Sequence, residues 1–141
     1  MEQAGWLAVN LDYAGVAGSE AVTVLLVDDD PLVRMTTAIV LEGAAYAVLE
    51  AGHGPHAVAL IARHPGRFSM LVTDFHMPHG MTGVDLVEHM RPLYPRIPMV
   101  IATALPDVID AGWAVRHAVR VLAKPYSAAA LLSLLAALVA G

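Results

Sequence analysis

Short aliphatic runs alternate with helical patterns from Val22 to the end of the chain. The runs are continuously apolar, as is typical of strands that are covered on both faces. The predicted strands are residues 22–28, 46–51, 69–75, 97–104 and 119–124. Strands that alternate with helices form a parallel sheet with helices on both faces. The pattern therefore predicts an α/β domain with a doubly wound, five-stranded parallel sheet.

The intervening segments carry helix signals of differing strength. Helices are predicted over residues 31–45, 54–65, 83–94 and 127–140. Asp30 precedes Pro31, which indicates an N-cap followed by a proline in the first turn, and Gly43 is a plausible helix end. A fourth helix should fall within 105–118, but Gly112 interrupts the pattern there. We expect that helix to be short or irregular.

The two ends of the chain differ from this regular pattern. Residues 1–20 contain several glycines and no sustained periodicity, so we expect an extension that is ordered only if something docks it, before a domain at 21–141. In the last helix, one side covers the sheet through Leu131, Leu134, Leu135 and Leu138. The other side is also apolar, where charge would be normal, through Ala129, Leu132, Ala136 and Val139. Such a face is typical of association, so we expect a homodimer or a docked partner there, the alternative being alanine-rich filler.

Composition excludes several functional classes. The chain has 141 residues, enough for one domain with a real core, and 57% of them are hydrophobic. Its longest nearly apolar run, 128–140, is shorter than the roughly 20 residues that span a bilayer, so no membrane association is expected. The acidic N-terminus does not resemble a secretory signal, and no cysteine is available for disulfides, thiolate sites or nucleophiles. A net charge of −5 without a basic stripe argues against nucleic acid. We expect a cytoplasmic location.

Polar residues gather where the predicted strands end. In open parallel sheets, the ligand site lies beyond the carboxyl ends of the strands. Acids follow the first and third strands, a hydroxyl ends the fourth and an amine ends the fifth: Asp28, Asp29, Asp74, Thr103 and Lys124. These side chains should therefore meet at one edge of the sheet.

The chemistry of this set is restricted. Clustered carboxylates raise one another's pKa unless a cation pairs with them, and oxygen ligands favour a hard ion such as Mg²⁺. A lysine and a hydroxyl suit phosphoryl oxygens, and an aspartate can accept a phosphoryl group covalently. Positioning and charge neutralisation supply most of the catalysis of such a transfer. The set indicates Mg²⁺-dependent phosphorylation of an aspartate.

At these positions the chain resembles the receiver domains of bacterial two-component response regulators. The matching pieces, in family order and spacing, are "VLLVDDDPLVR", "LVTDFHMP", Gly83, "VIATA" and "LAKPY", and the resemblance covers roughly residues 21 to 140. Each motif alone is weak, whereas the ordered set is specific. The resemblance implies a flavodoxin-like (βα)5 fold. It also implies phosphoryl transfer from a histidine kinase or a histidine phosphotransfer protein, in two-component signalling or a phosphorelay.

The resemblance also implies a metal site. Asp74 corresponds to the phospho-acceptor. Asp29 corresponds to a direct Mg²⁺ ligand and Asp28 to an acid that acts more through water. The main-chain carbonyl of His76 would complete the metal ligands that the protein supplies.

Other roles follow from the same resemblance. Thr103 would bond a phosphoryl oxygen and shift on phosphorylation, and Lys124 would pair with the phosphate. A cis peptide often precedes the proline that matches Pro125 and would help aim Lys124. Val121 stands where many members have an aromatic side chain that swings inward, so the signal is expected to be read out differently, through reordering of 105–118.

The histidines support two interpretations. His76 and His79 are three residues apart, as are His53 and His56, which suits a metal site only on a helix, and the first pair surrounds Pro78 in a loop. The favoured interpretation places His76 over the acceptor, with Leu105 as its counterpart on the fourth strand's loop, so that the two shield the acyl phosphate from water.

Other functions suit this set of residues less well. An Asp-Asp-Asp-Pro string alone is more typical of a turn, and a pseudo-receiver would only bind proteins. An aspartate-nucleophile phosphatase needs a second acid where His76 stands, and the acids after the first strand would repel a flavin phosphate. We expect a stand-alone receiver, since the last helix runs to the end of the sequence. It would catalyse its own phosphorylation and dephosphorylation without being a turnover enzyme.

Overall fold

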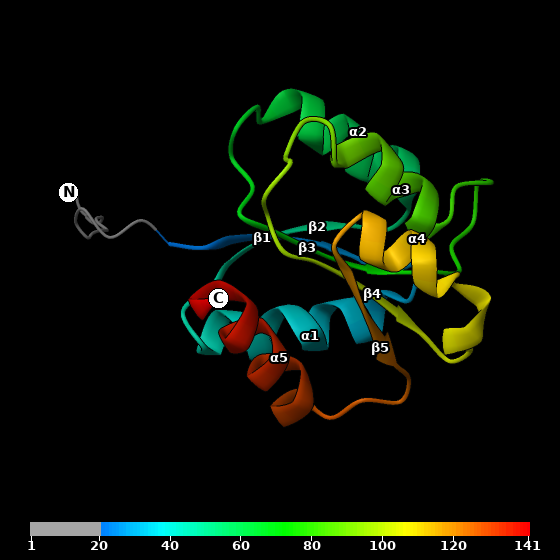
Figure 1. The fold of residues 1–141 in the computed structure, drawn as a ribbon. Helices are drawn as coiled ribbons and strands as arrows, with labels where there is room; N and C mark the ends of the chain where they lie inside the picture. Colours follow the sequence, from blue (N-terminus) through cyan, green and yellow to red (C-terminus); the bar gives the residue numbers. More distant parts are fainter. Residues whose placement is uncertain (1–20) are drawn as a thin grey trace.

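The computed structural model describes residues 21–141, and a parallel sheet forms its centre (Figure 1). The strands are β1 (Thr23–Val27), β2 (Ala47–Ala51), β3 (Met70–Asp74), β4 (Met99–Thr103) and β5 (Val119–Ala123). They lie in the order β2-β1-β3-β4-β5, and every neighbouring pair is parallel. This confirms the predicted doubly wound sheet. The extension expected at 1–20 lies outside the described residues.

Helices cover both faces of the sheet. They are α1 (Pro31–Gly43), α2 (Gly54–Arg63), α3 (Gly83–Met90), α4 (Ala111–Arg116) and α5 (Ala128–Ala140). Figure 1 shows α1 and α5 on one face and α2, α3 and α4 on the other. Within residues 21–141, no helix combines the length and the apolarity needed to cross a bilayer.

Two hydrophobic cores explain why the strands are continuously apolar. Alternate side chains of a strand point to opposite faces. In β1, Leu25 and Val27 join the core under α2, α3 and α4, whereas Val24 and Leu26 join the core under α1 and α5. All four are at most 2% exposed. A strand buried on both sides cannot carry the alternating pattern of a half-exposed strand.

The segment before β5 is irregular, as predicted. It consists of a single 3₁₀ turn, Pro106–Val108, followed by the six-residue α4. The indole N–H of Trp113 in α4 donates to Glu88 of α3 at 2.9 Å, and its ring stacks on His117 with centroids 4.5 Å apart. The short helix is therefore held by specific contacts with α3 rather than by a long amphipathic face.

The last helix covers the sheet as predicted, with one correction. Leu131 and Leu135 are fully buried, and Leu134 and Leu138 pack against the same core. Leu132 was expected on the outer side, which is wrong: it is partly buried and packs against this core as well. Leu132 lies about 100° around the helix from Leu131, so a core that reaches over the helix flank still contacts it. Ala129, Ala136 and Val139 are exposed, as expected.

Candidate functional site

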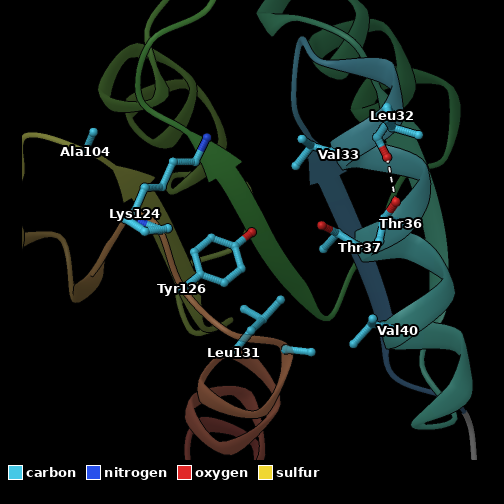
Figure 2. A pocket seen from close by; sticks show the side chains of 11 residues that line it. Leu32, Val33, Thr36, Thr37, Val40, Ala104, Lys124, Tyr126 and Leu131 are labelled. Atoms are coloured by element: carbon cyan, nitrogen blue, oxygen red, sulfur yellow. Dashed lines mark hydrogen bonds between the residues drawn. The ribbon is translucent and has the colours of Figure 1, made fainter.

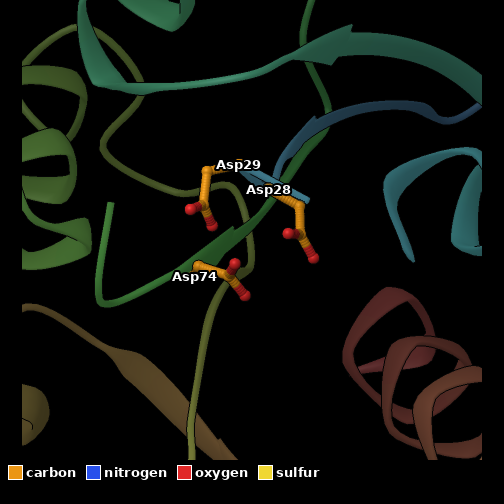
Figure 3. A group of neighbouring side chains, drawn as sticks. All are labelled: Asp28, Asp29 and Asp74. Carbon is orange, nitrogen blue, oxygen red and sulfur yellow. The ribbon is translucent and has the colours of Figure 1, made fainter. Parts of the chain in front are cut away.

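Three carboxylates meet at the carboxyl edge of the sheet. Asp28 and Asp29 follow β1, Asp74 ends β3, and one oxygen from each lies within 4.8 Å of the others (Figure 3). Asp28 is 4% exposed and Asp74 6%, whereas Asp29 is exposed. Two of the acids are therefore buried beside each other, and the third faces solvent across the same space.

The turn after β1 is held by its own polar groups. One carboxylate oxygen of Asp28 accepts the main-chain N–H of Asp30 at 2.9 Å. Asp30 then caps α1 by accepting the N–H groups of Leu32 and Val33 at 3.0 and 3.2 Å, which confirms the predicted N-cap. The three consecutive aspartates thus have separate structural positions: one anchors the turn, one faces the solvent side of the site and one begins a helix.

Arg34 braces this turn, a contact that the sequence analysis missed. Its guanidinium donates to the main-chain carbonyl oxygen of Asp28 at 2.8 Å and pairs with Glu50 of β2 at 3.2 Å. Arg34 lies one turn beyond Asp30, which is a local signal. Its partner Glu50 could only be found once β2 was known to lie beside β1.

Lys124 and Thr103 complete the edge from β5 and β4. The ammonium of Lys124 lies 2.7 Å from the Asp74 carboxylate, and its main-chain N–H donates to the Thr103 carbonyl oxygen at 2.8 Å. Thr103 is 2% exposed, and its hydroxyl oxygen accepts the N–H of Leu105 at 3.0 Å, which leaves its own proton available for donation. The peptide bond between Lys124 and Pro125 is cis, as the resemblance implied.

Burial dominates the electrostatics at Asp74. Burial raises the pKa of Asp74 to about 7; the hydrogen bond from Lys124 opposes this effect, and the neighbouring Asp28 adds to it. Burial lowers the pKa of Lys124, but the hydrogen bond and charge of Asp74 outweigh that effect and leave it raised. One ammonium therefore does not neutralise the buried acids, and the site favours an additional cation.

The donor set fits a hard divalent ion. Three carboxylates at mutual ligand distance, without sulfur or imidazole among them, are the oxygen ligands that Mg²⁺ prefers. Bound there, a divalent cation would lower the raised pKa of Asp74 and keep its carboxylate ionised at neutral pH.

The neighbourhood of Asp74 requires glycine at one position. A Cβ added to Gly83, the first residue of α3, would collide with the main-chain carbonyl oxygen of Asp74. Thr82 caps this helix and forms a reciprocal capping box with Asp85. Helix α3 can therefore begin directly against the end of β3 only because its first residue has no side chain.

The predicted shielding pair lies at the surface of this edge. The side chains of His76 and Leu105 are both exposed, Leu105 by 61%. The ring of His76 lies edge-on to the ring of Phe75, with the two centroids 4.6 Å apart. The metal-ligand role of the His76 carbonyl stays a prediction. His53 has a structural position instead: its Nδ1 accepts the His56 N–H at 3.1 Å and caps α2. Its ring meets His79 edge-on at 4.5 Å.

A groove opens beside this site, between α1 and α5. Its volume is about 640 Å³, and Lys124 and Tyr126 line one end (Figure 2). Tyr126 and Thr37 both line the groove, and burial raises the pKa of Tyr126. Residue spacing gives no signal for Tyr126 or Thr37, because only the approach of α1 to the segment before α5 places both in the groove lining.

Known proteins share this fold and sequence. The family described as response regulator receiver domain matches residues 24–136. The response regulator protein FleR of Pseudomonas aeruginosa is 35% identical over 119 residues, covering 82% of this chain and 24% of FleR. The phyllosphere-induced regulator PhyR of Methylorubrum extorquens is 26% identical, covering 84% of this chain and 45% of PhyR. The chain thus spans less than half the length of these relatives.

Solved structures agree. The chemotaxis protein CheY4 of Vibrio cholerae superposes with a TM-score of 0.73 at 27% identity, covering 84% of this chain and 99% of CheY4. The receiver domain of the hybrid histidine kinase CckA gives 0.67 at 26% identity, covering 80% and 94%. Matched along most of its length and built on the same five-stranded sheet, the chain belongs to the response regulator receiver domain family.

Proposed function

We propose that Asp74 accepts a phosphoryl group from a phosphohistidine, in a Mg²⁺-dependent reaction of two-component signalling or a phosphorelay. The observation that carries this proposal is the buried Asp74 carboxylate, 2.7 Å from Lys124 and within ligand distance of Asp28 and Asp29. Receiver domains in general accept phosphoryl groups as signalling modules and bind Mg²⁺ at such an acidic pocket. Asp28, Asp29, Asp74 and the His76 carbonyl are the proposed metal ligands.

The proposed transfer balances as a simple displacement. A carboxylate oxygen of Asp74 forms a bond to phosphorus while the bond between phosphorus and the donor imidazole nitrogen breaks, and the imidazole keeps the electron pair. Lys124 then pairs with a phosphoryl oxygen, and the Thr103 hydroxyl donates to another. Asp28, Asp29 and Asp74 would hold Mg²⁺, which would supply charge neutralisation for the transfer.

The proposed partner is a histidine kinase or a histidine phosphotransfer protein, in the cytoplasm. The domain would promote its own phosphorylation and dephosphorylation without turning over a separate substrate. Its organisation, an extension at 1–20 before a receiver domain at 21–141, remains part of the proposal. We also propose that α5 takes part in self-association, because Ala129, Ala136 and Val139 leave its outer face apolar and exposed.

The readout of phosphorylation is proposed to pass through Thr103 and Leu105. Donation by the Thr103 hydroxyl to a phosphoryl group reorients the oxygen that now accepts the Leu105 N–H at 3.0 Å. Val121, three residues before Lys124, is an aliphatic side chain that packs against the core beneath α4. With no aromatic ring at 121 to swing inward, the segment 105–118 is the element free to respond.

A protein-binding module that needs no phosphorylation is the less favoured alternative. It would not need a buried aspartate with a raised pKa beside a lysine and two further acids. Asp28, Asp29, Asp74, Thr103 and Lys124 lie together at the carboxyl edge of the sheet, which supports acceptance over binding alone.

Phosphorylation with a small donor tests the proposal directly. The chain is incubated with Mg²⁺ and acetyl phosphate and its intact mass is measured; one added phosphoryl group is expected. Asp74→Ala should abolish the addition, and EDTA should prevent it. Asp107→Ala is the matched control, because Asp107 is an exposed aspartate outside the site and should leave the addition unchanged. A phosphoryl group that persists in Asp74→Ala contradicts the assignment.

A further inference from the structure

The part of the chain that the structure describes begins at the amino end of β1, beside the end of α1. The main-chain carbonyl oxygen of Val22 accepts the N–H of Ala47 at 3.0 Å. The preceding residue, Tyr46, donates its N–H to the carbonyl oxygen of Leu41 in α1 at 3.1 Å. The side chain of Val22 packs against the core under α1 and α5. Residues 1–20 therefore join the domain at the face that these two helices form.

The groove between α1 and α5 extends along this face. Val40 lines it near the end of α1, and Lys124 and Tyr126 line its other end, next to Asp74 (Figure 2). From Leu32 to Val40 the α1 wall of the groove is about 12 Å long, at the rise of an α-helix. Most of the lining residues are aliphatic. The groove therefore suits a short apolar segment that enters from the side of Val22.

The first twenty residues of the chain contain such a segment. Leu7, Val9 and Leu11 occupy every second position, directly after Trp6. Alternate side chains of an extended segment share one face, and the distance from Leu7 to Leu11 would be about 13 Å. This length matches the α1 wall of the groove. The chain from Leu11 to Val22 can span up to about 35 Å, so the segment can reach the groove of its own domain.

Charge and hydrogen bonding favour the same occupant. Among the described residues that line the groove, Lys124 is the only charged one, and its side chain is 32% exposed. Residues 1–20 contain three acids and no Lys or Arg. An aromatic ring at this end of the groove would face the Lys124 ammonium in a cation–π contact. The hydroxyls of Thr37 and Tyr126 can bond the main chain of an extended segment.

We propose that residues 6–11 occupy the α1–α5 groove of their own chain, with Leu7, Val9 and Leu11 against its aliphatic lining and Trp6 at the Lys124 end. Because the segment is tethered, its effective concentration is in the millimolar range. A segment that binds as a separate peptide with a dissociation constant of about 0.1 mM would then be docked roughly nine-tenths of the time. A contact too small to hold two separate chains together is therefore sufficient. The proposal does not depend on phosphoryl transfer.

The fluorescence of Trp6 in the full chain tests this proposal. The chain has one other tryptophan, Trp113. The emission of Trp6 is obtained as the difference between the unsubstituted chain and Trp6→Phe, which keeps the contact of Trp113 with Glu88. The reference is a synthetic peptide of residues 1–20. We expect the emission of Trp6 in the full chain to be blue-shifted relative to the peptide and several-fold less sensitive to quenching by acrylamide.

Charged substitutions in the groove should release the segment. Val33→Asp places a negative charge in the lining and should return the emission of Trp6 to that of the peptide. Its matched control is Ile39→Asp, because Ile39 lies on the same helix, is 65% exposed and lies outside the lining. Ala128→Asp, at an exposed lining position of α5, is a second variant, with the exposed Ala129→Asp as its control. Circular dichroism confirms that each variant is folded.

Each other result overturns the proposal in its own way. If acrylamide quenches Trp6 equally in the full chain and in the peptide, the groove is left to another ligand. Protection that survives both Val33→Asp and Ala128→Asp would place the segment elsewhere on the domain. Protection that increases with chain concentration from about 5 µM to about 500 µM would mean that the segment enters the groove of a second copy, since intramolecular docking is independent of concentration.

Discussion

The hydroxyl oxygen of Thr103 accepts the main-chain N–H of Leu105 across 3.0 Å, which ties a buried site residue to the exposed segment before α4. If the hydroxyl turns to a phosphoryl group, this hydrogen bond weakens. We therefore expect the amides of 105–118, beginning with Leu105, to exchange hydrogen faster once a beryllofluoride phosphate mimic and Mg²⁺ are bound. Hydrogen exchange by mass spectrometry measures this. Thr103→Val should abolish the change in this segment; an unchanged segment in the unsubstituted chain argues against this route.

Shielding of the acyl phosphate by His76 and Leu105 is a second prediction. Both side chains are exposed at the site edge, where they can obstruct the approach of water to Asp74. His76→Ala and Leu105→Ala should each shorten the lifetime of phosphorylated Asp74 severalfold, as followed by loss of the added mass. Val108→Ala, exposed in the same segment, is the control. Unchanged lifetimes in both variants would rule out shielding.

The raised pKa of Asp74 has a consequence for stability. Its folded-state value of about 7 lies above its ordinary value of 3.8 because of burial and Asp28, so ionising it destabilises the fold. Without metal at pH 8, Asp74→Asn should raise the free energy of unfolding by roughly 1 to 4 kcal/mol. Between pH 4 and pH 7 the folded state of the unsubstituted chain binds more protons than its unfolded state. The stability gained by Asp74→Asn therefore shrinks as the pH falls from 7 toward 4.

Denaturant unfolding in EDTA at several pH values measures this difference. Added Mg²⁺ should reduce the difference in the free energy of unfolding between Asp74→Asn and the unsubstituted chain at pH 8. The ion should bind the ionised carboxylates of the unsubstituted chain and stabilise that chain. Asp107→Asn, at an exposed position, should show neither effect. A difference in stability that is independent of both pH and Mg²⁺ would contradict a raised pKa at Asp74.

The first residue of α3, Gly83, lies directly against the main chain of Asp74. Gly83→Ala forces a Cβ onto the Asp74 carbonyl oxygen and should cost roughly 1 to 3 kcal/mol of stability, together with slower phosphorylation by acetyl phosphate. Gly43→Ala is the matched control, since nothing lies within 4 Å of the added Cβ and its φ is not positive. That variant should be neutral or slightly stabilised. Equal effects at the two positions would contradict the close-approach argument.

His53 gives a pH-dependent cap. Its Nδ1 must be unprotonated to accept the His56 N–H, and burial, followed by the charges of His79 and His56, lowers its pKa. Because the folded-state pKa lies below the ordinary 6.5, the stability from this cap is present above that pH and lost as pH falls below it. His53→Ala should therefore lower the Tm at pH 8 and much less at pH 5. His53→Asn keeps a capping oxygen without the titrating ring and should remove most of the pH dependence; a pH-independent loss in His53→Ala would exclude the cap as its cause.

The periodicity of the chain by itself determined the strands, the helices and the sheet type, because burial on both faces demands continuous apolar runs and parallel strands demand helical connections. It also determined which polar residues meet, since Asp28, Asp74, Thr103 and Lys124 all end strands at the same edge. Asp30 as a helix cap was equally local.

The tertiary structure decided what depends on the angular position of packed elements. Leu132 turns inward because the core reaches over the flank of α5, and Glu50 receives Arg34 because β2 lies beside β1. The contact of His53 with His79 joins two loops that are distant in sequence, and Tyr126 and Thr37 line the same groove only because α1 lies beside α5. Such contacts depend on the distances between side chains on different elements, which residue spacing along one chain does not encode.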